Sequence, residues 1–164
     1  MIIRSARDDD APTIRTILVA AFAGGAEADL VDRLRADGDL ALALAAEDGG
    51  LCGCVAFPKL MVDDDGRTHD AAGLAPIAVM PGRQQQGIGG ALVRRGHRLL
   101  AARGVSLIFV LGDPAYYARF GYSRDAAAAF ESAYAGLYFM ALRLNEKAPK
   151  SGKVRYPAAF DGLS

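Results

Sequence analysis

A glycine-rich turn between a predicted strand and a predicted helix is the feature that most constrains the fold. Residues 72–80 are mostly apolar and predict the strand, and Gly87 to Ala102 predicts an amphipathic helix. Between them stands Gln84-Gln85-Gln86-Gly87-Ile88-Gly89-Gly90. Small residues let a ligand approach the backbone, and the first N–H groups of a helix lack internal partners. Such a turn is typical of phosphate binding, although the glycines could also serve only close helix packing.

Two well-known phosphate loops are excluded by the residues around this turn. A Walker A loop needs Gly-Lys-Ser/Thr, and no lysine stands here. The dinucleotide fingerprint needs a third glycine at position 92, which is Leu92. ATP and NAD are therefore not the expected ligands.

The rest of the chain predicts a mixed sheet with helices on both faces. Besides the helix from Gly87 to Ala102, helices are expected from Asp10, as a cap, to Phe22 and from Ala26 to Ala36, and Asp113-Pro114 should start a fourth, short one. Pro76 inside the strand 72–80 indicates an edge or a bulge. We expect one domain over 1–164, in which the end after about residue 145 could be loosely attached. The other expected strands are 2–6, 40–47, 51–57, 105–111 and 137–144.

Composition excludes several classes of function. The 19 basic and 19 acidic residues balance, so no net field favours nucleic acid or an anionic membrane. No apolar run reaches the roughly 20 residues of a membrane span, and we expect a cytoplasmic protein. Cys52 and Cys54 form a C-x-C pair that is neither a zinc site nor a redox motif, so we expect buried thiols and no metal.

A second motif agrees with the first. Leu111-Gly112-Asp113-Pro114-Ala115-Tyr116-Tyr117-Ala118-Arg119-Phe120-Gly121-Tyr122 follows the predicted strand 105–111. Gln84-x-x-Gly87-x-Gly89 resembles the acyl-CoA signature of the GNAT N-acetyltransferase superfamily, and this second segment resembles the tyrosine block of its bacterial YhbS-like branch. The likeness extends more loosely from residue 1 to about 144.

The resemblance implies an α+β fold with a mixed, mostly antiparallel sheet of about six to seven strands, splayed between strands four (72–80) and five (105–111). Acetyl-CoA, the implied cosubstrate, would lie in the splay, with its pantetheine along strand four and its pyrophosphate in the loop 84–90. The implied cofactor-binding residues are Ile77, Ala78, Val79, Met80, Arg83, Gln84, Gln85, Gln86, Gly87, Ile88, Gly89, Gly90, Asp113, Tyr116, Tyr117 and Phe120.

The resemblance also implies a catalytic residue. Tyr117 stands four residues before Gly121, the spacing at which similar enzymes carry the tyrosine that protonates the leaving thiolate. Both Tyr116 and Tyr117 could instead only pack the cofactor wall. No general base is visible, since Glu27, Asp29 and Asp113 are more typical of caps or solvated groups.

Other charged residues are weaker candidates. Arg83, beside the loop, is the best candidate for the 3′-phosphate of coenzyme A, while Arg94, Arg95 and Arg98 are equally well explained by a solvated helix face. His69 follows a polar turn and His97 lies on the polar side of its helix, so both are expected to be exposed.

The expected function is transfer of an acetyl group from acetyl-CoA to an amine of a small molecule or protein, through a tetrahedral intermediate. The alternatives are a catalytically weak acyl-CoA sensor and a plain interaction domain. The acceptor is not predicted. Phe130, Tyr134, Tyr138 and Phe139 could complete the core or a dimer contact, which leaves monomer and homodimer open.

Overall fold

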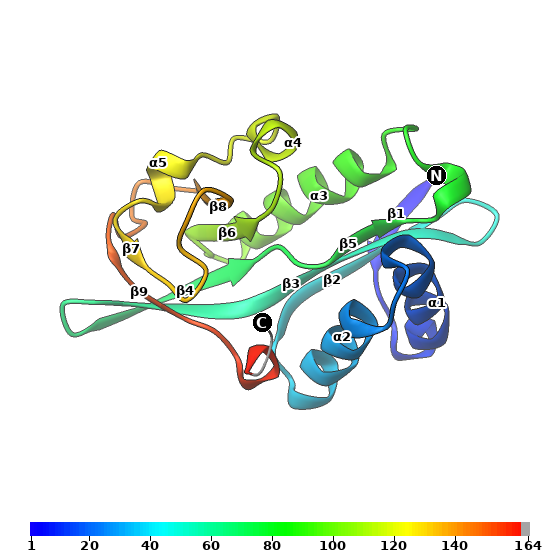
Figure 1. The fold of residues 1–164 in the computed structure, drawn as a ribbon, viewed down its shortest axis with the longest axis horizontal. Coiled ribbons are helices and arrows are strands. Elements are labelled where there is room, and N and C mark those ends of the chain that lie inside the picture. The colour runs from blue at the N-terminus through cyan, green and yellow to red at the C-terminus, as the bar shows by residue number, and fades with distance from the viewer. Residues whose placement is uncertain (162–164) are drawn as a thin grey trace.

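A computed structural model describes residues 1–161 of the chain (Figure 1). In chain order the elements are β1 (Ile2–Ser5), η1 (Asp8–Asp10), α1 (Ala11–Phe22), α2 (Ala26–Asp37), β2 (Leu40–Glu47), β3 (Leu51–Asp64), β4 (Arg67–Gly73), β5 (Ile77–Val79), η2 (Pro81–Arg83), α3 (Ile88–Ala102), β6 (Leu107–Leu111), α4 (Pro114–Ala118), α5 (Arg124–Ala127), β7 (Phe130–Glu131), β8 (Phe139–Arg143), β9 (Gly152–Arg155) and η3 (Ala158–Phe160).

The strands form one mixed, mostly antiparallel sheet, as predicted. Its main path runs β1-β2-β3-β4-β6-β8, with β5 and β9 both paired to β3 and β7 paired to β9. Only the β4–β6 and β7–β9 pairs are parallel. The described residues give nine strands rather than six or seven, because the predicted strand 72–80 falls on two strands, β4 and β5, and the short β7 and β9 were not predicted.

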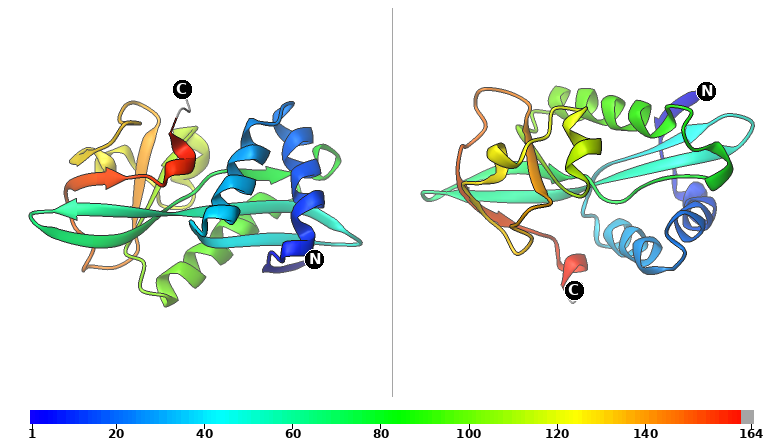
Figure 2. Two further views of the ribbon diagram at one scale, coloured as in Figure 1. Left: turned by 90° about the horizontal axis from the view of Figure 1, so that it is seen from below. Right: turned by 45° about the horizontal axis from the view of Figure 1, so that its top comes forward.

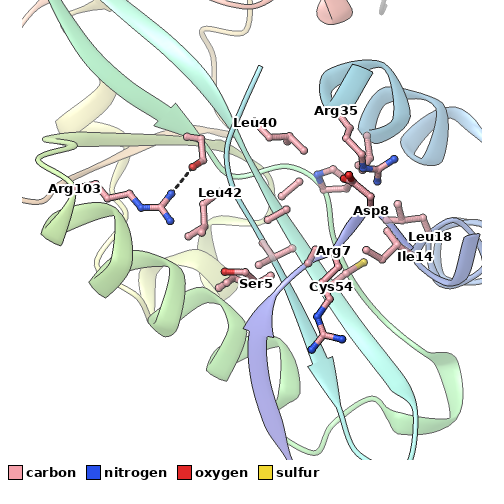
Figure 3. Close-up of a pocket in the computed structure, with 18 residues that line it drawn as sticks. Ser5, Arg7, Asp8, Ile14, Leu18, Arg35, Leu40, Leu42, Cys54 and Arg103 are labelled. Carbon is pink, nitrogen blue, oxygen red and sulfur yellow. Dashed lines mark hydrogen bonds between the residues drawn. The ribbon is translucent and has the colours of Figure 1, made fainter. Parts of the chain in front are cut away.

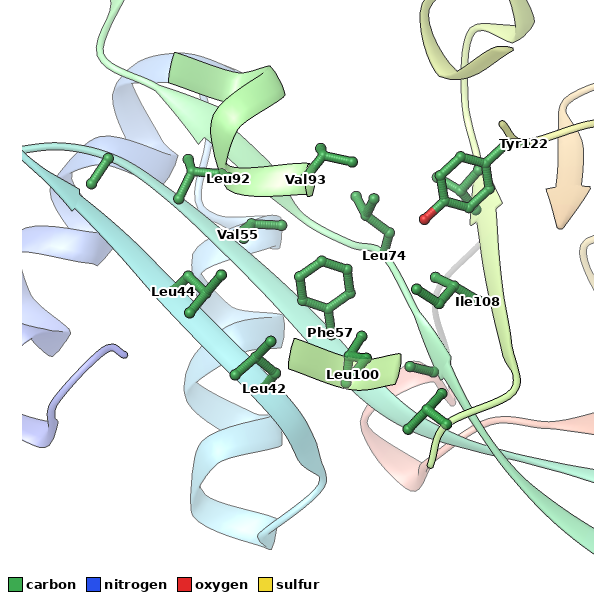
Figure 4. Packing of buried hydrophobic residues seen from close by; sticks show 14 of the residues in the cluster. Leu42, Leu44, Val55, Phe57, Leu74, Leu92, Val93, Leu100, Ile108 and Tyr122 are labelled. Carbon is green, nitrogen blue, oxygen red and sulfur yellow. The ribbon is translucent and has the colours of Figure 1, made fainter. Parts of the chain in front are cut away.

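Helices cover both faces of this sheet. Helix α3 lies on one face, and α1 and α2 lie on the other (Figures 1 and 2). The core beneath α3 centres on Phe57, with Leu92, Val93 and Leu100 of the helix packed around it (Figure 4). On the opposite face Ile17 and Leu18 of α1 pack with Val31 of α2 against β3. The buried side of α1 is made by Ile14, Ile17 and Leu18, whereas Phe22 at the end of the helix is 43% exposed.

Helix α3 approaches the sheet closely at Gly96. A Cβ atom placed on Gly96 would lie 2.3 Å from Cζ of Phe57, which is far inside van der Waals contact. Any larger residue would force the helix away from β3 or displace a fully buried ring. Gly96 therefore sets the distance between α3 and the strands that it covers.

Asp10 does not act as the side-chain cap that was predicted for α1. Its carboxylate accepts hydrogen bonds from the Arg4 guanidinium at 2.7 and 2.9 Å and from the Arg7 backbone N–H at 2.7 Å. These partners, Arg4 foremost, lower the pKa of Asp10 to about 2. The expected cap failed because the partly buried Arg4 guanidinium competes more strongly for a carboxylate than a helix N–H does.

The C-terminal segment is tied to the long strand β3. Val154 of β9 pairs with Val62 and is buried, and the Arg155 guanidinium forms an ion pair with Asp63. The turn of η3 that follows lies against α2 (Figure 2). Within residues 1–161 no helix has the length and apolar character needed to cross a membrane.

Candidate active site

The sheet opens between β5 and β6. Parallel pairing of β4 with β6 covers Ala72 and Gly73, and the Leu74 N–H then donates to the Phe109 carbonyl at 2.9 Å. From there the chain leaves β6 and stays beside β3, with which β5 pairs through Ile77 to Val79. The two strands therefore diverge and leave a gap in the sheet, as predicted.

The single strand predicted over 72–80 is two strands, β4 and β5. Pro76 separates them because it has no N–H for a ladder hydrogen bond. The chain at this point is held by β3 instead, since the Ala75 N–H donates to the Ala56 carbonyl at 3.1 Å and the Ala56 N–H donates to the Pro76 carbonyl at 3.0 Å.

Strand β5 presents an open backbone edge to the gap. Pro76 and Met80 use their backbone groups toward β3, since the Met80 N–H donates to the Cys52 carbonyl at 2.9 Å. Backbone groups alternate along a strand, so those of Ile77 and Val79 point away from β3. The Gln84 side-chain amide donates to the Val79 carbonyl at 3.2 Å, which agrees with this direction. An extended ligand could add to this edge as a strand would.

The glycine-rich loop joins this edge to the start of α3. Gly87 is the N-cap of the helix and has φ +82°, in the left-handed region that favours glycine. The first helical bond runs from the Ala91 N–H to the Gly87 carbonyl, 3.1 Å away. The N–H groups of Ile88, Gly89 and Gly90 precede that bond, and they point out of the helix end where an anion is stabilised.

A cavity of about 580 Å³ lies between the β5 edge, this loop and α4. Eleven of the sequence-predicted residues line it, and Arg119 is one more that the sequence reasoning missed. The predicted lining residues are Ile77, Ala78, Val79, Arg83, Gln84, Gln85, Gly87, Ile88, Gly89, Gly90 and Tyr116. The predicted residues outside the lining are Met80, Gln86, Asp113, Tyr117 and Phe120.

The tyrosine block forms the far wall of this cavity. Asp113 begins α4 as its N-cap, since its carboxylate accepts from the Ala115 N–H at 3.0 Å. The Tyr116 hydroxyl lies 3.0 Å from where a Cβ of Gly89 would be, so the phenol reaches over the start of α3. The Arg119 guanidinium stacks 4.4 Å from the centre of the Tyr116 ring. Arg119 therefore brings a positive charge to the phosphate side of the cavity.

Tyr117 lies deeper than Tyr116, beside the end of β6. A Cβ atom on Gly112 would lie 2.6 Å from its ring, and the ring packs edge-to-face against both Tyr116 and Tyr122. Burial, and secondarily Tyr116, raises the pKa of Tyr117 to about 12. The phenol is therefore protonated at neutral pH, the state that a proton donor needs.

His97 is not exposed as predicted but is hydrogen-bonded to the tyrosine block. Its Nε2 lies 2.8 Å from the hydroxyl of the buried Tyr122, and the two rings are in contact. Burial, together with the nearby charge of Arg94, lowers the pKa of His97 to about 4. The imidazole is therefore neutral at physiological pH. The expectation failed because residue 122 covers this side of α3, a contact that helix periodicity does not show.

The predicted arginines are partly engaged by protein groups. Arg83 donates to the Asp48 carboxylate at 2.7 Å and to the Gln86 side chain at 3.2 Å, which links the loop to the β2–β3 turn. Arg94 lies over the Phe120 ring, 5.0 Å from its centre. Arg95 and Arg98 are exposed on α3. Arg83 and Arg119 are the two arginines that line the cavity.

None of the carboxylates considered as a base is presented to the cavity. Asp29 of α2 forms an ion pair with Arg15 at 2.8 Å, Asp113 caps α4, and Glu27 lies on α2, across the sheet from α3. Within residues 1–161 no three His, Cys, Asp or Glu side chains are grouped to hold a metal ion. Both cysteines are buried and unpaired with each other, and burial raises the pKa of Cys54 to about 12.

Another cavity, of about 280 Å³, lies under α1 and α2. Its apolar floor includes Leu42 and Cys54, and Arg7, Asp8 and Arg35 stand around it (Figure 3). The lining comes mainly from η1, α1, α2, β2 and β3, away from the glycine-rich loop and the tyrosine block. Pro76 is the one residue between β4 and β5 in its lining, so this cavity meets the gap region only there.

Comparison with known proteins agrees with this geometry. A family described as an acetyltransferase (GNAT) domain matches residues 2–124. The uncharacterised N-acetyltransferase YhbS of Escherichia coli K12 is 42% identical over 128 residues, which cover 77% of this chain and 75% of that protein. The uncharacterised N-acetyltransferase YjhQ of the same organism is 37% identical over 116 residues, covering 69% and 64% of the two chains.

Two solved structures are similar over nearly the whole chain. A GNAT family acetyltransferase from Brucella melitensis, in complex with acetyl-CoA, has a TM-score of 0.82 at 37% identity and covers 98% of this chain and 97% of its own. E. coli YhbS in complex with CoA has a TM-score of 0.88 at 34% identity, with 99% and 93% covered. The gap, the loop and these matches together show that the chain belongs to the GNAT N-acetyltransferase family.

Proposed function

We propose that this protein transfers an acetyl group from acetyl-CoA to a primary amine, acting as a single catalytic domain in the cytoplasm. The observation that carries the proposal is the open edge of β5 running into the glycine-rich start of α3 within one cavity. The residues present fit acetyl-CoA. Gly87 has open space where a side chain would stand, and Gly82 beside the loop does too, so bulky phosphates could approach the backbone.

Each part of acetyl-CoA has a matching protein group. The backbone of Ile77 and Val79 would pair with the amides of pantetheine, as an added strand does. The N–H groups at the start of α3 would bind the pyrophosphate, and Arg119 would add a charge-assisted contact. Arg83 would have to give up its ion pair with Asp48 to bind a phosphate. We therefore assign Arg83 a secondary role in phosphate binding.

The reaction needs four changes at the gap. The neutral amine nitrogen forms a bond to the thioester carbon, and a tetrahedral intermediate develops whose oxyanion takes a hydrogen bond from a backbone N–H of β5. The carbon–sulfur bond then breaks. The sulfur takes a proton from Tyr117, and the amine nitrogen loses one to water. Tyr117 regains its proton from solvent.

The role of Tyr117 is testable with a matched neighbour. Tyr117→Phe removes only the hydroxyl, so we expect kcat to fall about 10²-fold while acetyl-CoA affinity changes little. In Tyr116→Phe we expect KM for acetyl-CoA to rise more than it does in Tyr117→Phe, because the Tyr116 phenol lines the cavity. Steady-state rates of thiol release measure both.

Two outcomes would contradict this assignment. A kcat loss in Tyr116→Phe that exceeds the loss in Tyr117→Phe would transfer the acid role to Tyr116. Equal losses of kcat and of acetyl-CoA affinity in Tyr117→Phe would leave it as packing only. Tight acetyl-CoA binding without turnover on any amine would support the sensor alternative instead.

A further inference from the structure

A second cavity, of about 310 Å³, borders the same gap in the sheet. One side is made by residues 73–75, where the chain leaves β4, and another by Phe109 to Leu111 at the end of β6. These are the two segments that diverge. The remaining wall consists of Pro58, Leu60, Tyr134, Phe139, Tyr156 and Phe160.

The two cavities lie on opposite faces of the sheet. Along β6, Ile108 and Val110 pack into the core beneath α3, whereas Phe109 packs with Phe139 in a separate cluster on the other face. The second cavity includes those two phenylalanine rings and Phe160 of η3, the turn that lies against α2. A thioester held along the β5 edge would therefore be within reach from this side of the gap.

Five of the twelve residues that line this cavity are aromatic, and their rings contact one another. Tyr134 and Tyr156 meet edge-to-face with ring centres 4.9 Å apart, and Phe160 lies 5.4 Å from Tyr156. Phe109 and Phe139 are stacked at 5.5 Å. Such offset and edge contacts leave ring faces and edges that suit another aromatic group.

The lining carries no side chain that is charged at neutral pH. Its titratable groups are two phenols, and burial raises the pKa of Tyr156 to about 12. Burial, followed by the nearby Asp161 carboxylate, raises the pKa of Tyr134 as well. An ammonium ion would lose hydration here without a carboxylate in the lining to pair with, since Asp161 lies outside it, so the cavity favours the neutral amine that attacks the thioester.

The cavity is open to solvent. Tyr134, Tyr156 and Phe160 are only partly buried, and Leu111 at its edge is 54% exposed. An acceptor can enter such a cavity directly from solvent, whereas an acyl chain would need an enclosed extension of the cofactor site. The volume is near the lower limit of about 300 Å³ for small-molecule sites, which suits one ring.

We propose that this cavity binds the acceptor, and that the acceptor is a small primary amine with an aromatic substituent, such as an arylalkylamine. The inference rests on the proposed function, because it takes the acetyl donor to lie along β5. It assigns the aromatic substituent to the ring-lined wall and the nitrogen to the gap between Ala75 and Val110.

The first experiment compares two acceptors with the wild-type chain and saturating acetyl-CoA. We expect kcat/KM for 2-phenylethylamine to exceed that for 1,5-diaminopentane by at least about tenfold, because the diamine would bury a second charge. Octanoyl-CoA replaces acetyl-CoA in a parallel series. We expect it to be a poorer donor, and we expect 2-phenylethylamine not to compete with it.

A pair of matched variants tests the cavity itself. Leu111→Glu places a carboxylate at the rim, and we expect it to lower kcat/KM for 2-phenylethylamine and to reduce its advantage over 1,5-diaminopentane. Leu137→Glu makes the same change on a leucine that is 67% exposed and outside the lining, and it should keep the wild-type ratio. Acetyl-CoA should raise the melting temperature of both variants as it does that of the wild type.

The outcomes separate this inference from the proposed function. If acetyl-CoA stabilises the protein and an amine without an aromatic substituent is acetylated in preference to 2-phenylethylamine, the inference is wrong and the proposed function stands. If octanoyl-CoA is the better donor and 2-phenylethylamine competes with it, the cavity holds the acyl chain and the inference is also wrong. If no acyl-CoA stabilises the protein or is consumed, both are wrong.

Discussion

His97 and Tyr122 form a contact between α3 and the segment that carries the tyrosine block. The 2.8 Å hydrogen bond joins a neutral imidazole to a buried phenol, and Tyr122 in turn packs against Tyr117. At the residue scale, the sequence predicted Tyr117 from its spacing to Gly121 but not this support. The support is tertiary, since 25 positions separate the two partners.

The pair makes stability depend on pH. Because the pKa of His97 is lowered from 6.5 to about 4, its contribution is complete above pH 6.5 and is lost as pH falls toward 4, where both folded and unfolded chains bind the proton. We expect His97→Gln to show a smaller fall in the urea midpoint between pH 6.5 and 4 than the wild type.

Arg94→Gln is the companion variant, since the Arg94 charge contributes to the lowered pKa of His97. We expect it to raise that pKa and to make the same slope shallower without removing it. A His97→Gln variant whose urea midpoint falls as steeply as that of the wild type would show that His97 titrates normally.

At the scale of elements, α3 is the helix that positions both the phosphate loop and the core. The glycine-rich turn and the Gly87 start of this helix were predicted from local sequence. Its buried side includes Val93, Gly96 and Leu100, and Leu99 is only partly buried. From the sequence alone, Gly96 is only a residue of low helix propensity. The Phe57 ring beneath it, seen in the structure, explains why a glycine stands there.

The close contact at Gly96 gives a stability prediction. Gly96→Ala improves helix propensity by about 1 kcal/mol, yet we expect the free energy of unfolding to fall by about 1–3 kcal/mol because the methyl group meets Phe57. Urea denaturation measures the difference.

Gly90→Ala in the same helix is the matched control, since its methyl group would meet the movable end of Arg94 at 3.1 Å. We expect no loss of stability there. Adding Phe57→Leu to Gly96→Ala should recover part of the loss. A stabilised Gly96→Ala protein would mean that α3 does not lie this close to β3.

At the scale of the whole molecule, the C-terminal segment packs against both β3 and α2. Strand β9 pairs with β3, and Tyr156 and Phe160 after it complete the second cavity. The sequence did not predict β9, because four residues between polar neighbours carry little periodicity. The second cavity could not be predicted from the sequence either, because its lining comes from segments that meet only in the folded chain.

Hydrogen exchange tests whether this segment is an integral part of the fold. We expect the amides of residues 153–155 to exchange much more slowly than those of the connecting residues 145–151, because only the former pair with β3. Equal and rapid exchange over both ranges would instead support a loosely attached end.

The central claim, that the glycine-rich start of α3 binds acetyl-CoA, is tested most directly by a thermal titration. Wild type is compared with Gly87→Glu, and with Gly104→Glu at the other end of α3, where φ is +85° against +82° and space is equally open. At about 100 times Kd we expect acetyl-CoA to raise the melting temperature by roughly 5–10 °C in wild type and Gly104→Glu, and not in Gly87→Glu. No shift in the wild type, or an undiminished shift in Gly87→Glu, would contradict the claim.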